Sequence, residues 1–325
     1  MQALWKQMNQ QDHLGQKALQ KARFHQSRQQ SLMPFIAQQG YGLINYQLHR
    51  IGFEGRYKRK DYIKMFKVAD AHCDYLNKVM ERGYDIIKPK PGQTIILENM
   101  RSGGVALQFF AAWLNKDYSL PVNQQLTVMT QAYKDMLECH ETALGELTKA
   151  FDFNAGRIAT VLTVEDLGAL GRCDNLLPLL CSKGVRAVTL TWNYNNILAG
   201  SSMDEGNKGL SPYGKEMVAL LNERNIAIDV SHLSDRGIDD LLTISSRPVF
   251  ASHSNARACI NTPRALQDAH IREIAKRNGV IGVNFCHLHL APKPKADVSD
   301  VIRHILHIYK IGGSKCCAIG SDYDG

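Results

Sequence analysis

Several common signals are missing from this 325-residue chain. No apolar run approaches the length of roughly 20 residues that crosses a membrane as a helix, and the N-terminus has no signal-peptide core. The eight cysteines form no C-x-x-C pair and no regular framework, which predicts reduced thiols in a cytoplasmic protein. There is no internal repeat. No G-x-G-x-x-G follows the first predicted strand, which counts against a dinucleotide-binding fold.

Charge is unevenly distributed along the chain. The formal net charge is +8, and much of the excess lies in the first sixty or so residues, which are rich in Gln, Lys and Arg. We interpret residues 1–62 as a basic extension, partly helical or disordered, and residues 63–325 as the main domain. The extension is either a solvated segment, which we favour, or an arm that docks onto a partner or onto the main domain. The excess charge therefore does not predict a nucleic-acid partner for the main domain.

From Phe66 onward, short apolar runs alternate with longer amphipathic segments. The runs span residues 66–72, 105–110, 158–164, 185–191, 226–231, 248–252, 280–285 and 316–321. Helical candidates between them include residues 130–150, 213–224, 268–278 and 297–311. Short β-rich runs that alternate with helices indicate a parallel sheet. Eight such units predict an α/β fold of the (β/α)₈ barrel type, with a doubly wound open sheet as the alternative.

Five of the predicted strands end in His, Asp or Glu. The first stretch, Val68-Ala69-Asp70-Ala71-His72-Cys73-Asp74, places His72 and Asp74 two residues apart, so that both side chains face the same way if the strand continues. The other candidates at strand ends are Glu165, His232, His253 and Asp322. Each residue alone has an ordinary structural role, as a hydrogen-bonded group or a helix cap. Five strands that converge on one barrel mouth favour a shared site.

This set of side chains fits two metal ions. Imidazole nitrogens and carboxylate oxygens suit zinc or a similar divalent ion. We expect His72 and Asp74 to hold one ion, His232 and His253 the other, and Glu165 to bridge them. Two ions about 3.5–4 Å apart lower the pKa of a shared water and give a hydroxide that attacks a carbonyl. Asp322 is the candidate that carries the proton to the leaving nitrogen.

With these residues in place, the chain from about Phe66 to Gly325 resembles the renal (membrane) dipeptidase family, peptidase family M19, of metal-dependent amidohydrolases. The matching stretches are Asp70-Ala71-His72-Cys73-Asp74, the strand ending at Glu165, Gly209-Leu210-Ser211-Pro212-Tyr213-Gly214, Asp229-Val230-Ser231-His232, Ser252-His253-Ser254, the Arg264 segment, Val283-Asn284-Phe285 and Gly320-Ser321-Asp322-Tyr323-Asp324-Gly325.

The resemblance implies a barrel with two zinc ions that hydrolyses dipeptides. It implies the same ligands, His72, Asp74, Glu165, His232 and His253. It also implies that Arg264 binds the terminal carboxylate of the substrate, for which a bidentate guanidinium is suited, and that Asp322 is the catalytic carboxylate.

Three departures from the family pattern affect these expectations. Trp192 and Asn193 follow the fourth strand where the mammalian pattern has a substrate-binding His, and either could replace that donor. His289 corresponds to a tyrosine that lines the mammalian substrate site. The family also continues beyond Gly325, so we expect the helix that covers the last strand to be missing. An outer face left bare in this way predicts aggregation or a homodimer, unless residues 1–62 cover it.

Two alternatives to a dizinc dipeptidase stay open from the sequence. A related amidohydrolase acting on N-acyl amino acids or β-lactams would use the same chemistry. A truncated, inactive barrel could act as a binding protein instead of an enzyme. The native metal, the oligomeric state and the stereochemistry of the substrate are not determined by these patterns.

Overall fold

The computed structural model describes residues 67–292 and 295–325. The basic extension, residues 1–62, lies outside the described residues, and so does its proposed docking. None of the helices in the described part of the chain combines the length and the apolar character that a membrane crossing requires.

The described residues form a ring of parallel strands. The strands are β1 (Val68–Asp70), β2 (Val105–Trp113), β3 (Leu144–Glu146), β4 (Ile158–Glu165), β5 (Val185–Thr189), β6 (Ala227–Asp229), β7 (Val249–Phe250), β8 (Ile281–Asn284) and β9 (Cys317–Gly320). Their order is β7-β6-β5-β4-β2-β1-β9-β8, and β3 pairs only with β4. A parallel bridge between Ala251 and Ile281 joins the two ends of this order. The prediction of a (β/α)₈ barrel is therefore confirmed.

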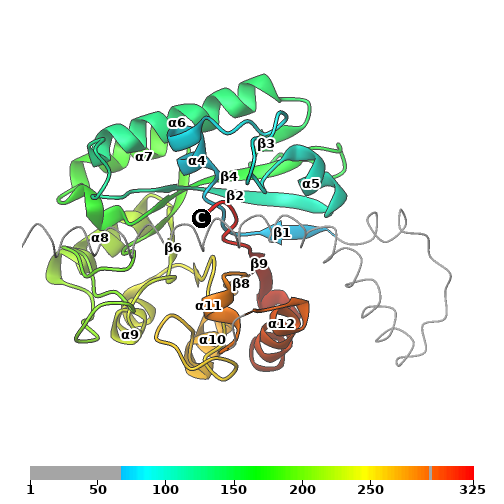
Figure 1. Ribbon diagram of the computed structural model, residues 1–325. Coiled ribbons are helices and arrows are strands. Elements are labelled where there is room, and N and C mark those ends of the chain that lie inside the picture. Colours follow the sequence, from blue (N-terminus) through cyan, green and yellow to red (C-terminus); the bar gives the residue numbers. More distant parts are fainter. Residues whose placement is uncertain (1–66, 293–294) are drawn as a thin grey trace, which may run out of the picture.

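Helices surround the ring on its outside. They are α4 (Tyr75–Arg82), α5 (Leu97–Ser102), α6 (Val122–Cys139), α7 (Leu177–Ser182), α8 (Pro212–Glu223), α9 (Asp235–Ile244), α10 (Asp268–Lys276), α11 (His287–Leu290) and α12 (Val298–Gly312). Figure 1 shows α4, α6 and α7 on one side of the strands and α9, α10 and α12 on the other. Parallel sheets need this cover because both of their faces are apolar.

One predicted helix is wrong in its bounds. The sequence predicts a helix over residues 130–150, but α6 begins at Val122 and ends at Cys139. The apolar residues beyond it belong to β3, where Leu144 pairs with Ile158 of β4 and is fully buried. An apolar residue such as Leu144 can be buried in a strand as well as in a helix. Periodicity alone does not distinguish a short buried strand from a continued helix.

Two glycines allow the backbone to approach closely inside the ring. A Cβ on Gly282 of β8 or on Gly320 of β9 would lie 1.9 Å from the carbonyl oxygen of Ser252. No side chain fits in that space, so only glycine lets the segment after β7 pack against both strands. This packing places His253, the next residue, at the centre of the barrel mouth.

The strands differ in how well they are covered. Every residue of β4 is buried, whereas Cys317, Ala318 and Ile319 of β9 are partly exposed. Partial exposure is shared by Val68 and Ala69 of β1, so it does not test whether β9 lacks a covering helix. Aggregation or dimerisation through the outer face of β9 stays a prediction.

Candidate metal centre

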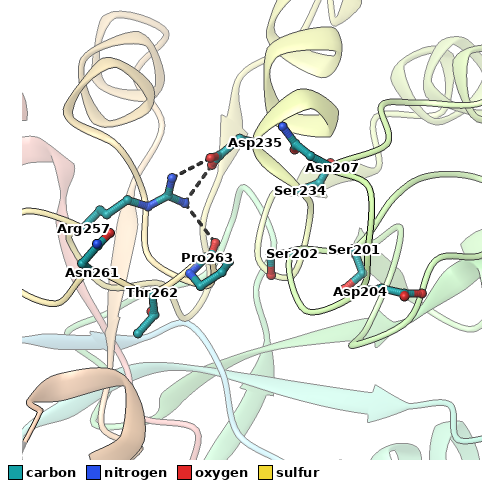
Figure 2. Close-up of a pocket in the computed structure, with 10 residues that line it drawn as sticks. All are labelled: Ser201, Ser202, Asp204, Asn207, Ser234, Asp235, Arg257, Asn261, Thr262 and Pro263. Atoms are coloured by element: carbon teal, nitrogen blue, oxygen red, sulfur yellow. Dashed lines mark hydrogen bonds and ion pairs between the residues drawn. The ribbon is translucent and has the colours of Figure 1, made fainter.

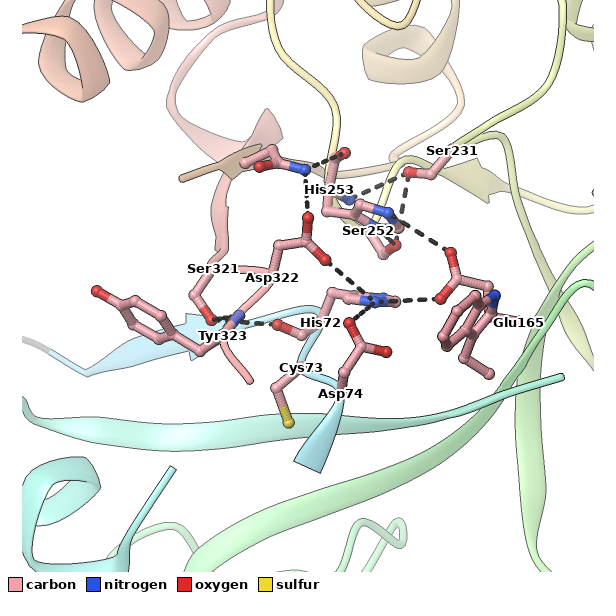
Figure 3. Close-up of polar contacts among 12 residues, drawn as sticks. His72, Cys73, Asp74, Glu165, Ser231, Ser252, His253, Ser321, Asp322 and Tyr323 are labelled. Atoms are coloured by element: carbon pink, nitrogen blue, oxygen red, sulfur yellow. Dashed lines mark hydrogen bonds and ion pairs between the residues drawn. The ribbon is translucent and has the colours of Figure 1, made fainter. Parts of the chain in front are cut away.

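The predicted site residues meet at the carboxyl ends of the strands, where a barrel of this type carries its functional groups. Glu165 is the last residue of β4, and the other candidates lie in the loops that follow β1, β6, β7 and β9. Three groups have ligand atoms within 4.8 Å of one another: His72, Asp74 and Glu165; Glu165, His232 and His253; and His72, His253 and Asp322. Figure 3 shows several of these side chains pointing toward one another.

His72 stands among three carboxylates. Its Nε2 lies 3.4 Å from Glu165 Oε2, 3.7 Å from Asp322 Oδ1 and 3.8 Å from Asp74 Oδ2. All of these side chains except that of Asp322 are almost completely buried. Three acidic groups around one imidazole form a negative pocket that favours a cation.

The geometry that brings His72 and Asp74 together differs from the one that the sequence predicts. β1 ends at Asp70, so neither residue belongs to a regular strand. A bridge between Cys73 and Tyr323 continues the pairing past the end of β1, and Asp74 occupies the N-cap position of α4 without a capping hydrogen bond from its side chain. The two side chains therefore converge where the strand turns into a helix, without the alternation of a longer strand.

Glu165 faces a second group of ligands through its other oxygen. Glu165 Oε1 lies 3.0 Å from His232 Nε2 and 3.7 Å from His253 Nε2, whereas Oε2 faces His72. The two histidine Nε2 atoms are 2.9 Å apart. The two oxygens of Glu165 therefore face opposite sides of the cluster, one with a single imidazole and the other with two.

Two buried aspartates hold the loops that carry the histidines. Asp70 Oδ1 accepts the backbone N–H of His72 at 3.3 Å and that of Ser321 at 2.9 Å. Asp229 Oδ1 accepts the backbone N–H of Ser231 at 2.8 Å and that of Ser252 at 2.9 Å. Each aspartate thereby ties together the ends of two adjacent strands, because one carboxylate oxygen can accept two donors.

Two site residues have left-handed backbone conformations. His232 has φ 69° and Asp322 has φ 59°. Such conformations cost free energy for residues other than glycine and are concentrated at functional sites. At both positions the chain turns sharply after a strand, which directs the side chain into the mouth of the barrel.

Burial and charge divide the histidines into two kinds. Burial lowers the pKa of His232 and of His253 well below the ordinary histidine value, so both rings favour the neutral form that binds a metal. Burial opposes the charged form of His72 as well, but the carboxylates of Glu165 and Asp74 outweigh it and raise its pKa. The same negative field that attracts a proton to His72 would attract a metal cation.

The donor atoms at this site fit a divalent metal. His72 Nε2, Asp74 Oδ1 and Glu165 Oε1 are buried and make no hydrogen bond. Buried polar atoms without partners cost about 1–3 kcal/mol each. Imidazole nitrogen and carboxylate oxygen are ligands that zinc accepts. Metal ions held by this cluster would give these buried atoms partners.

Arg264 lies beside this cluster with half of its guanidinium unpaired. Its side chain is buried, and Nη1 donates to Ser254 Oγ at 2.9 Å. Nη2 is buried and makes no hydrogen bond. A buried cation with free N–H groups is suited to receive a carboxylate.

The other substrate-binding candidates take different positions. Asn193 Oδ1 lies 3.0 Å from Nδ1 of His232, on the side of the ring that faces away from Glu165. The ring of Trp192 lies 6.4 Å from that of His232. His289 lies in α11, where burial and then the charge of Arg264 lower its pKa to about 4. Asn193 thus contacts a metal-ligand candidate, while Trp192 and His289 flank the site.

Trp113, which the sequence analysis did not single out, and Asn284, which it named only within a matching stretch, also contribute to the site. Trp113 ends β2 beside Glu165, and its ring lies 4.7 Å from that of Trp192. Asn284 ends β8 and donates from Nδ2 to Asp322 Oδ2 at 3.0 Å. Their position as the last residue of a strand was the available signal, since other strand ends supply the ligands.

Of two cavities in the described part of the chain, the smaller one is lined by a residue of the cluster and the larger one is not. Asp322 and Cys286 line one of 130 Å³, and a larger one of 520 Å³ lies beside Ser202 and Pro263. Figure 2 shows the larger cavity, whose Arg257 is bound to Asp235 and to the carbonyl of Pro263. Pro263, which lines this cavity, immediately precedes Arg264 in the chain, but Arg264 itself does not line it.

Several known proteins are similar to this chain in sequence and in fold. A protein of Schizosaccharomyces pombe named as an uncharacterised dipeptidase is 30% identical over 287 residues, which cover 80% of this chain and 70% of its own. A metallopeptidase of Rhodobacter sphaeroides, crystallised with a phosphinate mimic of L-Ala-D-Ala, has a TM-score of 0.71 and 23% identity, covering 80% of this chain and 86% of its own. The probable dipeptidase PvdM of Pseudomonas aeruginosa has a TM-score of 0.73 and 20% identity, covering 82% and 86%.

The two solved structures support the barrel fold. The family is established by the sequence itself, because residues 57–325 match the pattern of membrane dipeptidases. The chain therefore belongs to the membrane dipeptidase family, peptidase family M19, whose members are peptide-bond hydrolases.

Proposed function

We propose that this protein is a dizinc dipeptidase. The observation that carries the proposal is the placement of Glu165, whose two oxygens face His72 on one side and His232 with His253 on the other. This placement supports two ions with one shared carboxylate. When bound, such a pair supplies an activated water and polarises a carbonyl oxygen.

Arg264 would orient the substrate. A dipeptide has a free carboxylate one residue from its scissile bond, and Arg264 Nη2 is a buried donor without a partner. Binding the carboxylate there holds the scissile carbonyl over the Glu165 cluster in a fixed orientation. Longer peptides lack a carboxylate at this distance, so the arrangement favours dipeptides.

Asp322 would transfer the proton to the leaving nitrogen. Burial raises its pKa above the ordinary value of 3.8, which helps the carboxyl to hold a proton. Asn284 fixes one oxygen at 3.0 Å, and the other lies 3.7 Å from His72 Nε2. An oriented carboxyl at the edge of the cluster suits a general acid and base.

N-acyl amino acids and β-lactams are the alternative substrates. Both also combine an amide with a nearby carboxylate, so Arg264 would serve them equally. A binding protein without activity is less well supported, because all five ligand candidates converge in the structure.

Hydrolysis assays of the purified full chain separate these functions. The protein is stripped of metal with a chelator, reloaded with zinc, and given dipeptides, their C-terminal amides, N-acetyl amino acids and a β-lactam. We expect zinc to restore hydrolysis, fastest for free dipeptides. Faster turnover of the N-acetyl amino acids or the β-lactam would favour the alternative. No turnover of any substrate after zinc reloading would contradict the proposed function.

A further inference from the structure

Three buried serines connect Arg264 with His253. We call Ser231, Ser252 and Ser254 the serine chain; each is at most 2% exposed. Arg264 Nη1 donates to Ser254 Oγ at 2.9 Å, and Ser254 Oγ lies 3.1 Å from Ser231 Oγ. Ser231 Oγ is 3.5 Å from Ser252 Oγ, which lies 2.6 Å from His253 Nδ1. Figure 3 shows Ser231 and Ser252 beside the His253 ring.

Hydrogen bonds from backbone N–H groups hold the serine chain in place. Asp229 Oδ1 accepts the N–H groups of both Ser231 and Ser252, and Ser231 Oγ accepts the backbone N–H of His253 at 3.1 Å. Groups held in this way in a buried environment have few alternatives to their mutual hydrogen bonds. The serine oxygens are therefore held in place, and what can still change is mainly the direction in which each hydroxyl proton points.

The tautomer of His253 decides how those protons point. Each hydroxyl has one proton to donate and two lone pairs. A histidine that offers Nε2 to a metal carries its proton on Nδ1 and donates it to Ser252. Ser252 then has its proton available for Ser231, across a long contact of 3.5 Å, and Ser231, whose oxygen already accepts from the backbone of His253, has its proton available for Ser254. With the proton on Nε2 instead, all three directions are reversed.

The direction of the bonds changes what Ser254 can donate. In the first arrangement its oxygen accepts from both Ser231 and Arg264, so its own proton is free. In the reversed arrangement that proton is used in the bond to Ser231. Ser254 accepts a hydrogen bond from Nη1 of Arg264, and Nη2 of the same guanidinium makes no hydrogen bond. The first arrangement therefore offers two donors to an anion, and the second only one.

We propose that the serine chain couples metal binding at His253 to carboxylate binding at Arg264, with Ser254 as a second donor to the carboxylate. This inference rests on the proposed function, which assigns the metal to His253 and the carboxylate to Arg264. Coupling between two sites is reciprocal, so a carboxylate ligand tightens metal binding by the same factor. We expect a factor of about 5–10, near the lower end of the usual range.

Zinc affinity of the full chain, measured by competition with a chelator, tests the coupling. N-acetylalanine provides a carboxylate without a chelating amine, and N-acetylalanine amide is its uncharged match. In the unchanged protein we expect N-acetylalanine to tighten zinc binding by about 5–10-fold and the amide to have no effect. Ser254→Ala should abolish the difference between the two ligands.

Two further variants make the result decisive. Ser231→Ala removes the middle of the serine chain without touching Arg264 and should also abolish the difference. Ser245→Ala is the matched control, because Ser245 is buried but bonds to Asn222 and Arg247 instead; it should retain the difference. Equal zinc affinities with both ligands in the unchanged protein, or coupling retained in Ser254→Ala and Ser231→Ala, would overturn the inference. Dipeptide hydrolysis without coupling would leave the proposed function standing while the inference fails.

Discussion

The Nε2 atoms of His232 and His253 lie 2.9 Å apart, although the two residues are 21 positions apart in the chain. Both face the same oxygen of Glu165. Burial lowers the pKa of both rings well below the ordinary histidine value, so neither ring favours a charge that would repel a cation. Two neutral imidazoles that face one carboxylate oxygen are suited to bind a cation.

Removing the charge of Glu165 should lower the metal content. Glu165→Gln keeps the size of the side chain but replaces a carboxylate oxygen by an amide nitrogen, which does not bind metal. We expect two zinc ions per chain in the unchanged protein and one or none in the variant, measured by elemental analysis after zinc-supplemented expression. Glu141→Gln, at an exposed position, is the control and should keep two. Two ions in Glu165→Gln would show that the carboxylate is not shared.

Loss of Arg264 should reduce catalysis in a way that depends on the substrate. Removing one partner of a desolvated charge pair costs about 2–5 kcal/mol, or roughly 30-fold or more in kcat/KM. Arg264→Ala should lose this factor for a dipeptide and little for its C-terminal amide, which has no carboxylate. Exposed Arg272 provides the control variant Arg272→Ala. Equal losses for the dipeptide and the amide would assign Arg264 a structural role.

Asn193 should support the metal through His232. Its Oδ1 lies 3.0 Å from Nδ1 of His232, and this contact favours the tautomer with a lone pair on Nε2. Loss of such a partner commonly weakens metal binding by about 10–100-fold. We expect this loss in Asn193→Ala, measured by chelator competition, but not in Asn193→Asp, which keeps an acceptor. Asn123→Ala, at an exposed position, controls for nonspecific effects. Unchanged zinc affinity in Asn193→Ala would leave Asn193 as a substrate contact only.

The barrel and the ligand candidates could be predicted because both depend on local sequence. Parallel strands are buried on both faces, so β4 reads as a continuous apolar run that ends in Glu165. Strand ends gather at one mouth, which brings His232 and His253 to Glu165 without knowledge of the loops. The bounds of β1 were less predictable, because bridging of Cys73 to Tyr323 extends the pairing past the regular strand.

Contacts between loops could not be predicted from the sequence pattern. Asn193 follows β5 and His232 follows β6, and nothing in their spacing indicates that the amide contacts the imidazole. The sequence therefore suggested Asn193 as a substrate contact, a role that the structure does not test. The serine chain is similar, because serine at the end of a strand has many ordinary roles and only the folded arrangement shows its partners.

The last prediction concerns the pH dependence of stability near the larger cavity. Asp235 begins α9 and accepts two hydrogen bonds from Arg257, at 2.5 Å and 2.8 Å, and one from Gln267 at 2.8 Å. Burial opposes its charge, but these hydrogen bonds outweigh burial and lower the pKa below the ordinary 3.8. The folded protein thus favours the charged form more strongly than the unfolded chain does.

A group whose pKa is lowered by folding stabilises the protein above its unfolded pKa, and this contribution disappears as the pH falls through the folded value. Asp235→Asn keeps the shape but removes the charge, so at pH 7 it should lower the unfolding free energy by about 1–2 kcal/mol, allowing for partial exposure. Thermal unfolding should be followed on metal-free protein, because acid would also release a metal. The difference in midpoint from the unchanged protein should be a few degrees at pH 7, should begin to narrow near pH 3.8, and should close as the pH falls through the lowered pKa of folded Asp235. Asp117→Asn, at an exposed position, should show no such gap. A gap in Asp235→Asn that stays constant down to pH 3 would show that the lost charge is not its cause.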